Sequence, residues 1–409
     1  MQILTGDSCA TNGAAVDLMN EEASALPESD RLNSLVPQGR CFAHMFTNCG
    51  SVLKASCKDA RAFQSAFKKL AVSDACKAEF RVVTGVSMPT GSDNRFWSWY
   101  ERTVGLLDVW NLLPRFVGRC VQQKWMPKAS AKLKVILDDP IAKLCCGLQM
   151  VLIKLVGHSM VQATYFLEGN GFLAPFVWAE IESIEAMMRS LQHADETDAR
   201  FKQLVEFAEA NSSGLRRLDL IERCRDTWRA RLDFCSYWQK NVVAAMDIQV
   251  NVFKGLSVLH PVTVSTLAFE EVVARLQLLV QEERRNGQCL RSAGCKGVTN
   301  LTKRDCVASF GDYLKQAKEF APQVVITPFA QRPSLVWSWW WSLQHQQGLN
   351  AWFKLASYAV LIQPTSAVVE RFFSVLKGHT NAQQTAEMDE TLETRAMCLW
   401  NPSHMTRLD

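Results

Sequence analysis

The sequence predicts a predominantly helical protein, in which a short α/β segment precedes a long all-α block and a helical C-terminal piece. Three observations predict this order. Residues 2–4 are typical of the end of a buried strand, because the apolar pair is followed at once by Thr-Gly-Asp. A further helix, over residues 349–361, follows a dense block of tryptophans. Between these two parts, from about residue 96 to residue 321, apolar residues recur at helical spacing, for example at Ile181, Ile184, Met188 and Leu191.

The N-terminal part mixes strand and helix signals. We expect a helix over residues 12–26, and a short strand or a strand–helix junction over residues 40–44. Apolar residues at helical spacing, Phe63, Phe67 and Leu70, predict the buried face of a helix. Breaks in the long helical block are expected where proline or glycine interrupts it, at Pro114, Pro127, Pro140, residues 169–171, residues 211–214 and Pro261. The stretch 286–300, which contains glycine and serine, is the best candidate for an exposed loop.

The C-terminal part begins with the aromatic block Trp337–Trp341, which we expect in the core and in a dimer interface. Pro364 ends the helix 349–361, and a new helix over residues 366–377 closes at Gly378. This order is typical of a split domain that carries an insertion. The predicted division is residues 1–95, a short α/β core segment; residues 96–335, an α-helical insertion domain; and residues 336–409, a C-terminal segment for the core and for dimerisation.

Composition limits the classes of partner. The 409 residues leave room for two or three domains, and the net charge is only +4. Nucleic-acid contacts must therefore come from local basic patches and not from the overall field. The 14 cysteines are scattered without a CxxC pair. Reduced, buried thiols are the expected state.

No membrane segment is expected from the sequence. The longest apolar run, Leu144–Val156, is interrupted by Gln149 and Lys154 and is too short to cross a bilayer. The first residues lack the basic and long apolar regions of a signal peptide. Neither a membrane nor a small-molecule substrate is therefore predicted as a partner.

Two basic clusters stand out. The first combines six cations without an acid among them, interleaved with Phe116 and Trp125: Arg115, Arg119, Lys124, Lys128, Lys132 and Lys134. Such a run suits contacts to phosphates, and a solvated helical face would account for it equally well. The second cluster, Arg216–Arg231, also contains Asp219, Glu222 and Asp226, so we expect an ion-paired helix face there.

Four segments carry a resemblance to a known family. Residues 363–374 contain Ser-Ala followed by Glu370, Arg371 and Ser374 in a Glu-Arg-x-Phe-Ser-like core. This segment resembles the C-terminal signature of the hAT superfamily of DNA transposases. Residues 5–12, around Asp7, are similar to the segment of that family around its second catalytic aspartate. The two other matches are to its Cys-x-x-His element, at Cys41 and His44, and to its Arg-Trp motif, at Arg95 and Trp97 with Phe96 intervening.

The resemblance implies an α/β RNase H-like core, truncated at its N-terminus and interrupted by a large all-α insertion. The family cuts and joins DNA with three carboxylates that hold two divalent cations, Mg²⁺ or Mn²⁺. Such cations take oxygen ligands and clamp the attacking and leaving oxygens of a phosphodiester displacement. By the resemblance, Asp7 is the second carboxylate and Glu370 the third. The first should precede Asp7 and is absent, so we expect the chain alone to be inactive in metal-dependent cleavage and strand transfer.

Each of these residues also has a plainer interpretation. Asp7 follows glycine at a strand end and would serve as a turn or helix-capping residue. Glu370 would be an exposed helix residue beside Ser374. Cys41 and His44 lack a second ligand pair, so they suit a core pair better than a zinc site. For Trp97 the resemblance implies stacking on a base flipped from the flanking DNA, with Trp99 as the alternative ring.

The expected function is therefore that of a transposase-derived protein. DNA is the predicted partner, with Arg95, Trp97, Arg115, Arg119 and Lys124 as candidate contacts. The resemblance further implies a homodimer or a higher homo-oligomer and a location in the nucleus. The alternative is a domesticated protein that binds DNA and dimerises without catalysis, or a helical module with a dimerisation role only.

Overall fold

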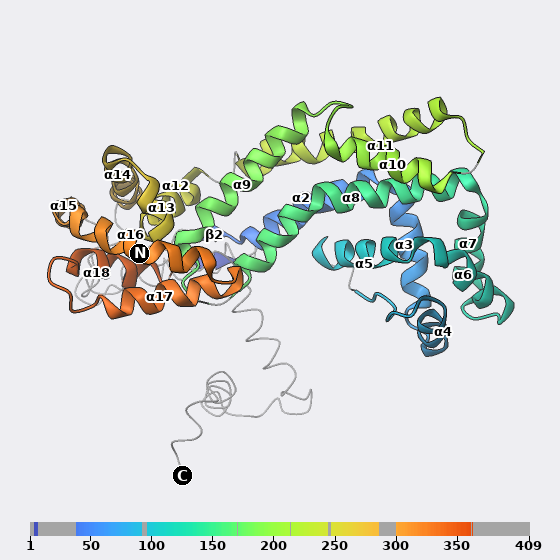
Figure 1. The fold of residues 1–409 in the computed structure, drawn as a ribbon, viewed down its shortest axis with the longest axis horizontal. Coiled ribbons are helices and arrows are strands. Elements are labelled where there is room, and N and C mark those ends of the chain that lie inside the picture. The colour runs from blue at the N-terminus through green and yellow to red at the C-terminus, as the bar shows by residue number, and fades with distance from the viewer. Residues whose placement is uncertain are drawn as a thin grey trace, which may run out of the picture. The chain divides into compact units, whose positions relative to one another are not determined.

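The computed structural model is almost entirely helical (Figure 1). It describes residues 4–6, 38–91, 96–169, 171–212, 214–243, 247–285, 300–360 and 362. The helical block predicted from the 3.6-residue periodicity is confirmed throughout this part of the chain. The predicted helices over residues 12–26 and 366–377 lie outside the described residues, as does the predicted loop over residues 286–300 except for Asn300, which begins α15.

The predicted α/β RNase H-like core is wrong. The described residues contain only two strands, β1 (Leu4–Gly6) and β2 (Gln38–Arg40), which pair in parallel with Leu4 opposite Gln38. A buried parallel strand is a nearly continuous apolar run, whereas β2 consists of Gln-Gly-Arg. Three residues per strand also fall short of a sheet that could carry a domain. The expected strand–helix junction is confirmed, because β2 is followed directly by α2 (Phe42–Ser56).

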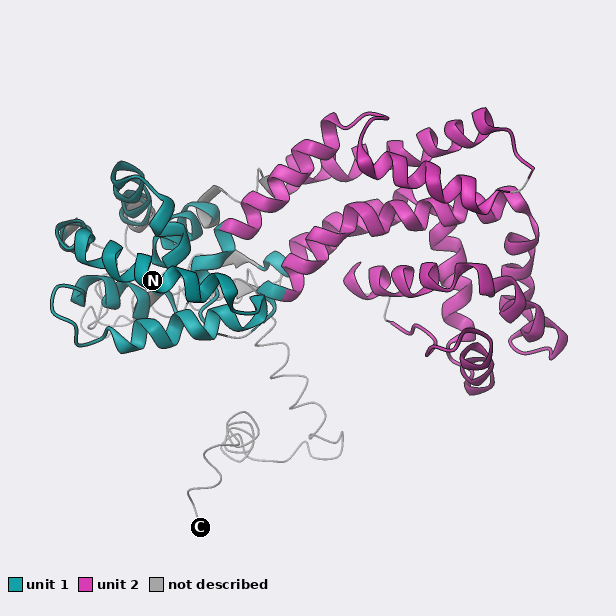
Figure 2. Cartoon of the chain, viewed as in Figure 1, with its two compact units in different colours: residues 1–43, 166–178, 248–409 teal, residues 44–165, 179–247 magenta. Residues whose placement is uncertain are grey.

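The chain forms two compact units (Figure 2). Unit 1 comprises residues 1–43, 166–178 and 248–409, and unit 2 comprises residues 44–165 and 179–247. Both units are discontinuous in sequence, and the predicted division into residues 1–95, 96–335 and 336–409 stays a prediction.

The described part of unit 2 is built mostly from α2 and ten later elements. They are α3 (Lys58–Leu70), α4 (Asp74–Thr84), α5 (Phe96–Asp108), η1 (Trp110–Leu112), α6 (Leu113–Gln122), α7 (Pro127–Asp138), α8 (Pro140–Leu167), α9 (Ala174–His193), α10 (Ala199–Asn211) and α11 (Arg217–Tyr237). A π-helical turn, η2 (Trp238–Val243), continues α11. The core around α3 is aromatic: the ring centroids of Phe67 and Phe80 lie 5.8 Å apart, and those of Phe80 and Phe116 5.1 Å. The predicted buried face of α3 is confirmed, because Phe63, Phe67 and Leu70 are fully buried.

The helix α3 is capped by a residue distant in sequence. Its N-cap residue, Cys57, forms no side-chain hydrogen bond to the first turn. Instead, Oε1 of Gln149 on α8 accepts hydrogen bonds from the backbone N–H groups of Asp59 (2.8 Å) and Ala60 (3.0 Å). Nε2 of Gln149 also donates to Oδ2 of Asp59 at 2.8 Å. The polar residue that interrupts the apolar run of α8 thus satisfies donors that a helix start leaves free.

In the part that the structure describes, unit 1 contains nine elements after residue 246. They are α12 (Asp247–Leu256), η3 (Ser257–Leu259), α13 (Pro261–Thr266), α14 (Phe269–Arg285), α15 (Asn300–Ala308), α16 (Phe310–Ile326), η4 (Phe329–Gln331), α17 (Arg332–Ser342) and α18 (Asn350–Ala359). The tryptophan block lies on α17, where Trp339 and Trp340 are buried and Trp341 is 54% exposed. The indole of Trp340 donates a hydrogen bond to the carbonyl of Leu259 at 3.0 Å. The predicted core role of the block is confirmed for the two buried rings.

The cysteines of the described part are free thiols, and all but the half-buried Cys145 are buried. Burial raises the pKa of Cys57, Cys120 and Cys306 to about 12, with nearby acidic groups or thiols as the smaller cause. A thiol with such a pKa is protonated at neutral pH and is therefore a poor nucleophile and metal ligand. The expectation of reduced, structural cysteines is confirmed for these residues.

Candidate nucleic-acid interface

The helices α6 and α7 form a helical hairpin that carries the first basic cluster. Both begin with a proline in the first turn, Pro114 in α6 and Pro127 in α7. Proline suits this position because the missing N–H group would have no partner inside the helix. Two of the breaks that proline predicted in the helical block, at Pro114 and Pro127, are therefore the starts of helices.

The hairpin is anchored through one face of each helix. The α6 face buries Leu113, Phe116, Val117 and Cys120, and the α7 face buries Ala129, Ser130, Leu133 and Leu137. α7 packs against α3 and α6, and α4 packs against α6. Because these apolar faces are used for packing, the basic residues of the hairpin are left on the opposite faces.

Four of the six cations are exposed and available to a ligand: Arg115, Lys124, Lys128 and Lys132. Their side chains form no hydrogen bond or ion pair with another residue of the described part. The other two are engaged: Arg119 pairs with Glu79 of α4, and Lys134 pairs with Asp138 at 2.7 Å. The four free side chains are called the hairpin cations below.

Positive charge is concentrated around this hairpin. Residues 58–138 contain 14 lysines and arginines against 7 aspartates and glutamates, a net charge of +7, although the whole chain carries only +4. No acid occurs between Asp108 and Asp138. A local surplus of this kind attracts a polyanion even when the molecule as a whole is nearly neutral.

The turn between the two helices holds backbone strain. Lys124 (φ 54°) and Met126 (φ 46°) are the two residues other than glycine with a positive φ in the described part. The N–H of Trp125 donates to the carbonyl of Cys120 at 2.9 Å, and that of Lys124 to Val121 at 3.1 Å. This pair of hydrogen bonds ends a helix through one left-handed residue, a position at which glycine is favoured. A lysine in the left-handed conformation is about 1–2 kcal/mol less stable than one in the right-handed conformation. Backbone strain of this kind concentrates at functional sites.

The second basic cluster has a different character. Arg216 pairs with Asp219 at 3.0 Å, Arg229 with Asp226 at 2.9 Å, and Arg225 with Glu196 of the loop after α9. The predicted ion-paired helix face is therefore confirmed. Charges that are neutralised by neighbours offer little to a phosphate backbone.

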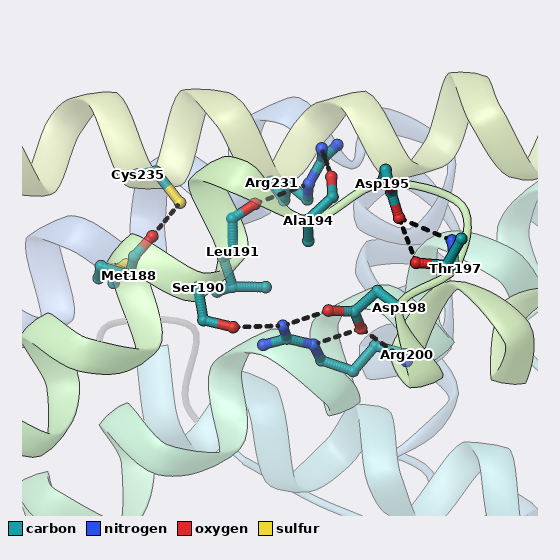
Figure 3. Close-up of polar contacts among 10 residues, drawn as sticks. All are labelled: Met188, Ser190, Leu191, Ala194, Asp195, Thr197, Asp198, Arg200, Arg231 and Cys235. Atoms are coloured by element: carbon teal, nitrogen blue, oxygen red, sulfur yellow. Dashed lines mark hydrogen bonds and ion pairs between the residues drawn. The ribbon is translucent and has the colours of Figure 1, made fainter.

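Arg231, the last member of that cluster, is buried. It lies beside Leu191 and Ala194 (Figure 3). Its guanidinium donates hydrogen bonds to the carbonyls of Leu191 (3.0 Å) and Trp228 (2.8 Å) and to that of Ala194. It also lies 4.6 Å from the ring centroid of Trp228. Arg231 thus completes the C-terminal end of α9 and does not face a ligand.

The residues that carry the transposase resemblance are placed as follows. Asp7, Arg95, Glu370, Arg371 and Ser374 lie outside the described residues. Among the residues that the structure describes, no group of three or more His, Cys, Asp or Glu side chains could hold a metal ion. The two Mg²⁺ or Mn²⁺ ions that the resemblance implies stay a prediction, because Asp7 and Glu370 are not among these residues.

Three motif residues are described. Cys41 is buried and His44 is exposed at the start of α2, so the core role suits the cysteine alone. Trp97 is half-buried on α5, with its ring centroid 5.4 Å from that of Tyr165. The indole N–H of Trp97 is buried without a hydrogen-bond partner. Stacking of Trp97 on a flipped base stays a prediction; Trp99, the alternative, is only 1% exposed.

One helix of the described part, α8, is long and apolar enough to cross a membrane by length and composition. It extends the apolar run Leu144–Val156 at both ends. In its most apolar window, 67% is buried inside the protein, as in the central helix of a globular core. There is thus no clear transmembrane segment in the described part.

The strained turn is the feature of this interface that the sequence analysis missed. Neither Lys124 nor Met126 is a residue type that signals a left-handed conformation, so no local pattern could have revealed them.

Comparison with known proteins adds no relative: no family model matches the sequence, and no curated protein matches it significantly. The resemblance to hAT transposases therefore depends on the motif residues alone and stays a prediction.

Proposed function

We propose that this protein binds DNA through the hairpin cations, Arg115, Lys124, Lys128 and Lys132. The observation that carries the proposal is that all four are exposed and unpaired within the described residues. They lie in the stretch 109–137, which contains no aspartate or glutamate. The motif resemblance supports descent from cut-and-paste transposases, and with it self-association and a nuclear location.

The physical basis is release of counterions. Each lysine or arginine that neutralises a phosphate displaces condensed cations from the DNA, so affinity falls with salt concentration. The slope of log K against log salt is about −0.9 per phosphate contact. Removal of a contacting cation must therefore flatten the slope as well as weaken binding.

The test is the double variant Lys128→Gln/Lys132→Gln. We expect its slope for duplex DNA to be about 1.8 units shallower than that of the parent protein, since two phosphate contacts are lost. Fluorescence anisotropy with a labelled duplex, between about 50 and 200 mM salt, measures the slope.

The matched control is Arg216→Gln/Arg229→Gln. This variant removes the same charge from exposed positions of unit 2, but each arginine there is paired with an aspartate. We expect its slope to equal that of the parent. Equal slopes for the two double variants, or no duplex binding by the parent at low salt, would refute the proposal.

Cleavage is measured separately, with hairpin-end DNA and Mn²⁺ or Mg²⁺. We expect binding without strand cutting, because the two three-residue strands of the described part fall short of a sheet that could carry a catalytic core. Robust metal-dependent cutting by this chain would show that Asp7 and Glu370 do act together, and the non-catalytic form of the proposal would fail.

A further inference from the structure

We propose that α7 is a recognition helix, which enters the major groove of duplex DNA as the second helix of a helix-turn-helix. This inference rests on the proposed function and adds to it the class of DNA and the element that contacts it. It follows from three observations: the turn between α6 and α7, the outward face of α7, and the burial of the aromatic rings of the hairpin.

The connection between α6 and α7 has the length that this motif requires. Four residues, 123–126, separate the end of α6 at Gln122 from the start of α7 at Pro127. Helix-turn-helix units use three or four residues, of which one is commonly glycine because the chain must turn sharply. Here the left-handed residues Lys124 and Met126 make that turn. The turn therefore fixes α7 against α6 and does not act as a loose linker.

The outward face of α7 suits the floor of a groove. Its exposed residues Lys128, Ala131, Lys132 and Val135 follow the spacing i, i+3, i+4 and i+7, which makes a single stripe along the helix. The lysines can bind phosphates or guanine edges, while alanine and valine can contact thymine methyl groups. An α-helix with its side chains is about 10–12 Å wide, which matches the width of about 12 Å of the major groove.

The charge along α7 sets the direction of entry. Lys128 and Lys132 lie in its first half, whereas Asp138 and Asp139 lie at its C-terminal end. Carboxylates are repelled by the phosphate backbone, so the N-terminal half should lie deepest. Recognition helices of this motif contact bases with their N-terminal residues in the same way.

The aromatic residues of the hairpin argue against a single strand as the ligand. Proteins that bind single strands stack bases on exposed rings. Phe116 is fully buried against Phe80, and Trp125 is half-buried in the turn. The rings that interleave the basic run are therefore part of the core or the turn, and the exposed groups that remain suit a duplex.

The experiment introduces a carboxylate into the groove-facing stripe, as Ala131→Glu. Position 131 is exposed and helical, so the fold should tolerate the change, and a thermal melt verifies this. We expect duplex affinity to fall at least tenfold. The control, Ala210→Glu, places the same charge at an exposed position of α10 and should bind like the parent.

Groove competition completes the test. We expect methyl green, a major-groove ligand, to displace the parent protein from duplex DNA, and netropsin, a minor-groove ligand, to leave it bound. A preference for single strands, displacement by netropsin alone, or equal affinities of Ala131→Glu and Ala210→Glu would each overturn the recognition-helix inference. If the salt slope still responds to Lys128 and Lys132, the proposed DNA binding survives that result; if the parent binds no duplex at all, the proposed function itself has failed.

Discussion

Replacement of Arg231 by methionine is expected to lower the free energy of unfolding by about 3 kcal/mol. The carbonyls of Leu191, Ala194 and Trp228 would each lose the hydrogen bond that the guanidinium donates. Methionine fills much of the same volume, so the loss reports mainly the hydrogen bonds and the contact of the guanidinium with Trp228. Urea denaturation followed by circular dichroism measures the change.

Two further variants serve as controls for this measurement. Arg231→Lys keeps the charge but cannot place several donors in one plane, so we expect an intermediate loss. Arg229→Met removes an exposed, ion-paired arginine from the same helix and should cost at most about 0.5 kcal/mol. If Arg231→Met were as stable as Arg229→Met, the capping role of Arg231 would be wrong.

Acid is expected to destabilise the protein through His260, which lies between η3 and α13. Burial, together with the positive charge of Arg332, lowers the pKa of His260 from 6.5 to about 4. Its Nδ1 accepts a hydrogen bond from the backbone N–H of Thr263 at 3.2 Å, and its ring meets that of Phe176 edge-on at 4.4 Å. Protonation of Nδ1 would place a donor against that N–H and break the cap of α13.

The sign of the effect follows from linkage. The folded protein holds His260 neutral, while the unfolded chain takes up a proton near pH 6.5, so the unfolded state is stabilised relative to the folded state as the pH falls. The contribution is complete above pH 6.5 and is lost between pH 6.5 and about 4, by about 3 kcal/mol in total. His260→Asn keeps a side-chain acceptor for the cap without titrating there, so its unfolding free energy should fall less over this window. The same pH dependence in both proteins would contradict the assignment.

Much of the helical fold could be predicted from the sequence alone. Phe63 and Phe67 are buried as their spacing predicts, α18 occupies the predicted helix after the tryptophan block, and Pro114 and Pro127 begin helices. Periodicity and proline act on neighbours within a few residues, so these features can be inferred before the chain is folded.

The sequence by itself also determined where positive charge collects, because the run from Arg115 to Lys134 contains no acid. Which of those cations remain free was decided only by the tertiary structure. Glu79 is 40 residues from Arg119, and Arg231 reaches a carbonyl 40 residues away, so neither engagement leaves a trace in the local pattern.

Strand pairing was decided in the same way. Isolated strand-like segments predicted an α/β core, but a strand is stable only when distant segments supply apolar partners on both sides, and β1 finds only the short, polar β2 in the described part. The left-handed backbone at Lys124 has the same origin, since the packing of α6 and α7 holds a conformation that lysine itself disfavours. Local sequence therefore fixed the helices of this protein, while contacts between distant residues determined which charges are exposed and which strands can pair.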